Sequence, residues 1–92
     1  GGYGAQPMRV PNVYTAPGST AVTDLSRIFV EGVTATSFDV TDSRIAAVSL
    51  DGQKLTVKGT AEGRTTASVT SSDGKTHAFI ITVRQAAGNG WL

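Results

Sequence analysis

The sequence predicts a small all-β domain, an antiparallel sandwich of about seven strands. Two Asp-Gly pairs, Asp51-Gly52 and Asp73-Gly74, each separate two runs in which apolar and polar residues alternate. Glycine after Asp allows the positive φ angles of tight hairpin turns, and alternation gives a strand one buried face. A length of 92 residues fits one sandwich of this kind. We therefore expect two hairpins within a single domain.

The two ends of the chain lack this alternation. Residues 1–8 hold three glycines and one proline, which is typical of a flexible tether. Residues 85–92 are predicted to be a linker or tail for the same reason. The single sandwich domain is expected to span residues 9–84.

The first third of the domain predicts a strand, a turn and a stretch that is open to two interpretations. Residues 9–15 suit a strand at a sheet edge, because Pro11 has no backbone donor. Residues 16–19 contain Pro-Gly, which suits a type II turn. Residues 22–30 carry apolar side chains at helical spacing, with Thr23 or Asp24 as a possible cap, but their β-forming content favours a strand.

The remaining strands follow from the alternation. Residues 34–40 predict one strand, residues 45–50 and 53–58 the first hairpin, and residues 65–70 and 79–83 the second. A small-residue corner ending at Gly63 joins the two hairpins. The predicted core consists of the inward-facing side chains of Phe38, Val48, Leu55, Val57, Val69, Phe79, Ile81 and Val83.

Composition excludes several classes of partner. The net charge is +1, and the basic and acidic residues are interleaved, so no basic stripe favours a nucleic acid. The sequence has no cysteine, which excludes disulfides and thiolate metal sites. Its longest apolar run is far shorter than the roughly 20 residues that span a bilayer.

No constellation of residues predicts catalysis, a metal or a cofactor, so we do not expect an enzyme. His77 is the only histidine, and we expect it on the solvent face beside the second turn. Asp39 and Asp42 are candidate calcium ligands, although turn formation is the simpler role for them. Tyr14 and Trp91 are the candidate ligand contacts, because exposed aromatic rings can stack on sugars.

The hairpin region resembles a known family. Residues 45–49 read Ile-Ala-Ala-Val-Ser, Gly63 closes the small-residue corner, residues 65–70 are rich in Thr, and residues 81–83 read Ile-Thr-Val. This pattern resembles the bacterial Ig-like domains of group 2 over residues 34–84, while the N-terminal third fits loosely. The motifs are structural, and they transfer a fold without functional residues.

The resemblance implies an Ig-like sandwich at the bacterial cell surface or outside the cell, following a removed leader or a lipid anchor. Its expected role is that of a spacer or an adhesion module, beside neighbouring domains of a larger surface protein and in contact with a host protein or polysaccharide. One alternative is a carbohydrate-binding module, and another is an accessory domain of a cell-envelope secretion or pilus apparatus. We expect a monomer.

Overall fold

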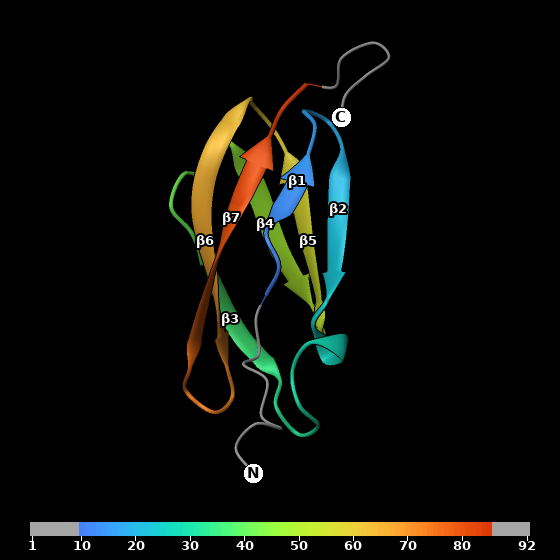
Figure 1. Ribbon diagram of the computed structural model, residues 1–92, viewed down its shortest axis with the longest axis vertical. Helices are drawn as coiled ribbons and strands as arrows, with labels where there is room; N and C mark the ends of the chain where they lie inside the picture. Colours follow the sequence, from blue (N-terminus) through green and yellow to red (C-terminus); the bar gives the residue numbers. More distant parts are fainter. Residues whose placement is uncertain (1–9, 86–92) are drawn as a thin grey trace.

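The computed structural model describes residues 10–85, and it is an all-β domain of seven strands in two packed sheets (Figure 1). The predicted tether at residues 1–8, Trp91 and nearly all of the predicted tail lie outside the described residues. The elements in chain order are β1 Val13–Thr15, β2 Thr20–Asp24, the 3-10 helix η2 Leu25–Arg27, β3 Ala35–Val40, β4 Ala46–Asp51, β5 Lys54–Gly59, β6 Gly63–Ser71 and β7 Thr76–Val83.

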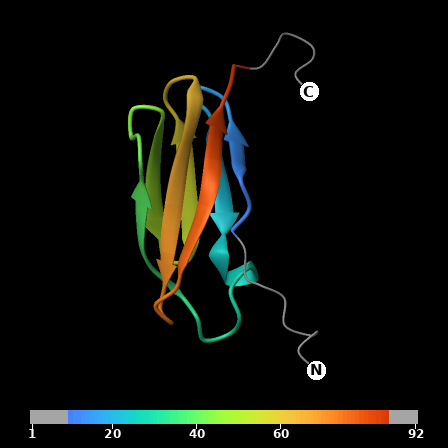
Figure 2. The ribbon, with the colours of Figure 1, turned by 60° about the vertical axis from the view of Figure 1, so that its left-hand side comes forward.

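The sheets contain the strands in the orders β1-β7-β6-β3 and β2-β5-β4. With β2 to β7 lettered B to G, the strand orders correspond to B-E-D and C-F-G, with β1 added beside G. Figure 2 shows the two layers from the side. All strand pairs are antiparallel except β1 and β7, which are parallel. The expectation of a purely antiparallel sandwich is therefore wrong at this pair, because β1 turns across the sandwich edge into β2 of the other sheet.

The core lies between the two sheets and follows the predicted alternation. Along β7 every second side chain is directed inward, and β5 and β6 supply the facing residues. The predicted core residues that are buried are Leu55, Val57, Val69, Phe79, Ile81 and Val83. Val10, Val13, Leu25, Phe29, Ala35, Ala46 and Ala67 complete the core cluster.

Two predicted core residues are less buried than expected. Phe38 lies opposite the buried Val69 and so faces the core, yet it is 39% exposed. Val48 is only partly buried. Both belong to edge strands, β3 and β4, and no further strand covers their outer side. Alternation predicts the face of a side chain, but burial also depends on the position of its strand in the sheet.

The strand predicted at residues 22–30 is correct only for its first part. Strand β2 ends at Asp24, whose side chain accepts hydrogen bonds from the Ser26 amide at 3.1 Å and from the Ser26 hydroxyl at 2.6 Å. This capping starts the single 3-10 turn of η2 and buries Leu25 completely. The helical spacing in residues 22–30 therefore corresponds to a single turn after β2. The Asp24 side chain caps this turn, and the capped turn forms in place of further β pairing.

The two hairpin turns use their glycines differently from the Asp-Gly expectation. Asp51 pairs with Lys54 in the strand ladder, so the central residues of the first turn are Gly52 and Gln53. A positive φ of 62° occurs at Gly52 alone, which is the pattern of a type II′ turn. In the second turn, the Gly74 amide donates to the Ser71 carbonyl at 2.8 Å, and Gly74 has a φ of 86°. That is a type I turn followed by a left-handed glycine.

Candidate functional site

His77 lies on the inward face of β7, so the expected solvent-facing position is wrong. It pairs with the buried Val69, and its ring packs against Phe29 with 5.2 Å between the centroids. Side chains two residues apart on a strand share a face. The alternation that places Phe79 inward therefore places His77 inward too, at the half-covered end of the sandwich.

A serine, a histidine and a carboxylate meet beside the second hairpin turn. The Ser71 hydroxyl lies 2.9 Å from His77 Nε2 and donates a hydrogen bond to the Asp73 carboxylate. In a hydrolase triad the histidine lies between the nucleophile and the acid, whereas here the serine lies between the other two. Ser71 is also only 1% exposed. Its hydroxyl is enclosed by the hairpin, whose ends this cluster ties together.

The Ser71 hydrogen bond holds the pKa of Asp73 below its usual value, with a further contribution from the Lys75 amide. The neighbouring loops are tied to this turn. The Ser72 amide donates to the Thr34 carbonyl at 2.7 Å, while the Thr34 amide donates to Ser72 Oγ at 3.1 Å. The turn therefore positions the start of β3, which is a structural role.

The carboxylates considered for calcium are separated. Asp42 forms a bidentate pair with Arg44, at 3.0 and 3.2 Å, and this pairing lowers the pKa of Asp42. Asp39 lies opposite Ser68 on the outer face of the four-stranded sheet, whereas the Asp42 amide donates to Thr65 Oγ1 at 3.0 Å beyond the end of β3. Among residues 10–85, no group of three or more His, Cys, Asp or Glu side chains is placed to hold a metal ion. The described helix is also too short to cross a membrane.

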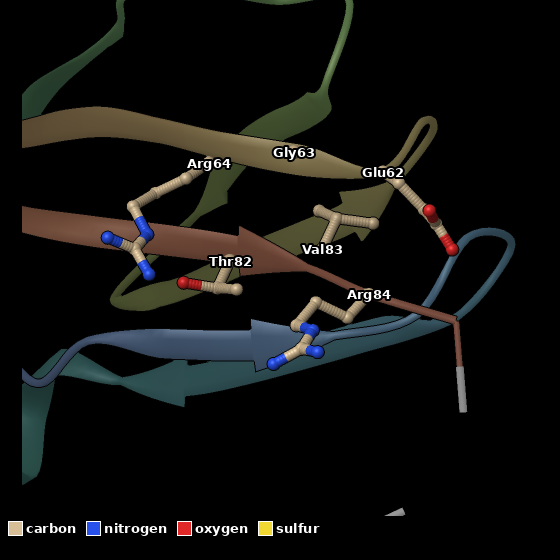
Figure 3. A pocket seen from close by; sticks show the side chains of 6 residues that line it. All are labelled: Glu62, Gly63, Arg64, Thr82, Val83 and Arg84. Atoms are coloured by element: carbon tan, nitrogen blue, oxygen red, sulfur yellow. The ribbon is translucent and has the colours of Figure 1, made fainter. Parts of the chain in front are cut away.

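A shallow depression lies at the end of the four-stranded sheet where β6 begins and β7 ends (Figure 3). We call it the β6–β7 depression. It is lined by Glu62, Gly63, Arg64, Thr82, Val83 and Arg84. Figure 3 shows the two guanidinium groups on either side of the Thr82 side chain, with the Glu62 carboxylate directed away from them.

Thr82 forms the floor of the β6–β7 depression. It points to the outer face of the sheet, opposite Arg64 on β6 and Tyr14 on β1, yet it is only 8% exposed. Long side chains on both sides cover it, as arginine stems do on protein surfaces. No hydrogen bond of its hydroxyl occurs within the described residues, and no buried polar side-chain atom there lacks a partner. The hydroxyl is therefore accessible from the depression.

Neither guanidinium group takes part in an ion pair within the described part of the chain, whose one salt bridge joins Arg44 and Asp42. Glu62 accepts a hydrogen bond from the Gln85 amide at 3.1 Å, which holds the carboxylate at the sheet end. The depression therefore presents two unpaired positive charges and one free hydroxyl to solvent.

The predicted ligand contacts are only partly placed. Tyr14 is 66% exposed on β1 and borders Thr82, while Trp91 lies outside the described residues. Sequence reasoning did not find Arg64 and Arg84. Their shared outward face is visible in the alternation, but their approach to Thr82 requires the β6–β7 register. Gly63 begins β6, where a Cβ atom would lie 2.7 Å from Ile45 Cδ1.

Comparison with protein-family models and with curated proteins finds no match for this chain. The description of its site therefore rests on its own residues.

Proposed function

We propose that this chain is a non-catalytic Ig-like module of a bacterial cell-surface or secreted protein, acting as a spacer or as an adhesion module. The sequence pattern of the group 2 bacterial Ig-like domains and the B-E-D and C-F-G strand order support this proposal. The buried Ser71, enclosed by its own hairpin, argues against hydrolytic chemistry at the place where suitable side chains meet.

One observation carries the spacer role. Strands β1 and β7 run in the same direction and β1 lies beside the last residues of β7, so the described chain starts near the middle of the sandwich and leaves at one end of its long axis (Figure 1). A module with this path can be joined to neighbours at both ends without doubling back. Neighbouring domains would then follow one another along the long axis.

The experiment is small-angle X-ray scattering on two copies of the 92-residue chain joined in tandem. We expect a maximum dimension close to twice that of one copy, since the first and last described strands run in the same direction. Two copies lying side by side would give a compact particle instead, and that result would contradict the spacer role.

The adhesion role is supported by the exposed ring of Tyr14 on the outer face of the four-stranded sheet. A screen of the purified chain against polysaccharides and host-matrix proteins tests it, with a core-truncated variant as the control for non-specific adsorption. Saturable binding that Tyr14→Ala or Trp91→Ala abolishes would favour a carbohydrate-binding module. If the folded monomer bound none of these ligands, the spacer role would be the only one of the two that remained.

A further inference from the structure

We propose that the β6–β7 depression, together with Tyr14, binds an acidic sugar: the guanidinium groups of Arg64 and Arg84 and the Thr82 hydroxyl hold a carboxylate or sulfate group, and Tyr14 contacts the ring that bears it. This inference rests on the adhesion role proposed above and not on the spacer role. It names both the site and the chemical class of its ligand.

The β6–β7 depression supplies several hydrogen-bond donors. Arg64 and Arg84 are exposed and have no ion pair among residues 10–85, and the Thr82 hydroxyl between them has no partner there. Guanidinium groups bind oxyanions through paired N–H donors, and such charge-assisted hydrogen bonds are stronger than neutral ones. Three donor groups that converge on one depression can therefore hold one oxyanion.

The donors and Tyr14 lie next to one another on neighbouring strands. Arg64, Thr82 and Tyr14 form a row across β6, β7 and β1, because Thr82 is the partner of both other residues. Adjacent strands lie about 4.8 Å apart, so the backbones of Tyr14 and Arg64 are about 10 Å apart. Side chains rising from both ends of such a row can flank a single sugar unit. The backbone of Arg84 is fixed beside them, since its amide donates to the Thr15 carbonyl at 2.9 Å.

The rest of the outer face of the four-stranded sheet favours an acidic sugar over other anionic ligands. On β6 and β7 the outer face beyond the depression carries no further cation: Thr66, Ser68, Thr70 and Thr76 supply hydroxyl groups, and Ala78 and the exposed Ile80 lie among them. Asp39 on β3 lies opposite Ser68 at the far side of this face. Nucleic acids and anionic membranes select longer runs of basic residues. Two arginines beside the exposed ring of Tyr14, with hydroxyl side chains at neighbouring positions, suit a glycan that carries isolated acidic groups.

Glu62 is the one carboxylate of the depression, and it opposes anion binding. It holds the Gln85 amide and points away from both arginines. The net charge of the three ionisable lining residues is therefore +1, from two arginines and one glutamate. Removing this negative charge is expected to strengthen binding, which provides a variant with an effect in the opposite direction.

The experiment is a titration of the full 92-residue chain, labelled with nitrogen-15, with a heparin tetrasaccharide, which carries both sulfate and carboxylate groups. A neutral cello-oligosaccharide of the same length and inorganic sulfate are titrated in parallel. We expect saturable shifts confined to residues 62–64, 82–84 and 14, no such shifts with the neutral sugar, and weaker binding of sulfate alone.

Variants then assign the contacts. Arg64→Gln with Arg84→Gln is expected to weaken tetrasaccharide binding on the order of tenfold or more, and Thr82→Val to weaken it less. Tyr14→Ala should weaken tetrasaccharide but not sulfate binding, whereas Glu62→Gln should strengthen both. Lys58→Gln is the matched control, because it removes an exposed cation from the other sheet. Unchanged thermal unfolding of each variant shows that the fold is intact.

Three results would overturn the proposal. Saturable binding can be absent, Lys58→Gln can reduce binding as much as the arginine variants do, or sulfate can bind as tightly as the tetrasaccharide. The last result would show a site for a free oxyanion with no contribution from the sugar. None of them alters the parallel pairing of β1 with β7 or the scattering of the tandem chain, so a failure of this site is distinguishable from a failure of the spacer role.

Discussion

At the residue scale, Phe79 and Phe38 both face inward, but only Phe79 is buried. Phe79 lies on β7 in the interior of its sheet, and Phe38 lies on the edge strand β3. Phe79→Ala leaves a cavity in a closely packed core and is expected to lower the free energy of unfolding by about 3–5 kcal/mol. Phe38→Ala removes a side chain that is already 39% exposed, so about 1 kcal/mol is expected.

Urea unfolding of both variants checks this difference. Equal losses would show that Phe38 is covered in solution by something beyond the described residues. A loss of only about 1 kcal/mol for Phe79→Ala would contradict the packing of the two sheets.

The carboxylate of Asp73 gives a pH-dependent prediction at the same scale. Its pKa in the folded chain is lowered from the usual value for Asp, chiefly because the Ser71 hydroxyl donates to it. A lowered pKa stabilises the fold at pH values above the unfolded pKa, and this stabilisation disappears as the pH falls through the folded pKa. Asp73→Asn keeps an acceptor oxygen but loses the charge.

We therefore expect Asp73→Asn to be less stable than the natural chain at pH 7, with a difference that shrinks steadily below about pH 4. Urea unfolding at a series of pH values measures that difference. Glu31→Gln serves as the control for a general change of charge on an exposed residue. A difference that stayed constant down to pH 2 would show that the hydroxyl bond does not favour the ionised carboxylate.

At the scale of elements, the end of β5 fits against the turn after β1 without space for a side chain. A Cβ atom on Gly59 would lie 2.5 Å from the Ala16 carbonyl oxygen and 3.0 Å from Val83 Cγ1. The Gly59 amide and carbonyl also pair with Ser19 and Gly18, each at 2.9 Å. This contact holds the β1–β2 turn against the second sheet.

Gly59→Ala is therefore expected to destabilise the fold by about 1–3 kcal/mol, because backbone and not a flexible side chain must move. The midpoint of thermal unfolding measures the effect. Thr60→Ala, at the exposed neighbouring position, should change stability by less than about 0.5 kcal/mol. A Gly59→Ala chain as stable as the natural one would mean that the turn packs further from β5.

At the scale of the whole molecule, sequence patterns predicted the all-β sandwich but not its details. Alternation is a local property of one strand, so it identified the inward faces of β5, β6 and β7. It could not identify edge strands, which depend on the order of strands in space, and it therefore overestimated the burial of Phe38. After Asp24 the chain forms a capped turn instead of continuing the β pairing. These two local structures are similar in energy, so alternation does not determine which of them forms.

The site shows the same division. The exposure of Tyr14 follows from alternation next to Pro11, an edge signal that the sequence carries. Arg64 and Arg84 lie on either side of Thr82 because of the register between β6 and β7. A search of the sequence for outward-facing arginines on neighbouring strands would find the pair, but only once the strand order is known.

The parallel pairing of β1 with β7 also determines how the domain responds to mechanical force. Tension applied between the two ends of the described chain pulls β1 and β7 past each other along their length. The ladder that joins Val13–Thr15 to Ile81–Val83 is then loaded in shear, so its hydrogen bonds must break together. The Arg84 amide bond to Thr15 and the Ile80 amide bond to Asn12 Oδ1, both 2.9 Å, extend that ladder at its two ends.

We expect single-molecule stretching from the chain ends to show a high and uniform unfolding force, and Asn12→Ala to lower it while changing equilibrium stability little. A pull applied between β3 and β6, which peels one strand from its neighbour a bond at a time, should require less force. A module exposed to flow or to a moving host surface would in this way resist extension along the direction in which it is tethered.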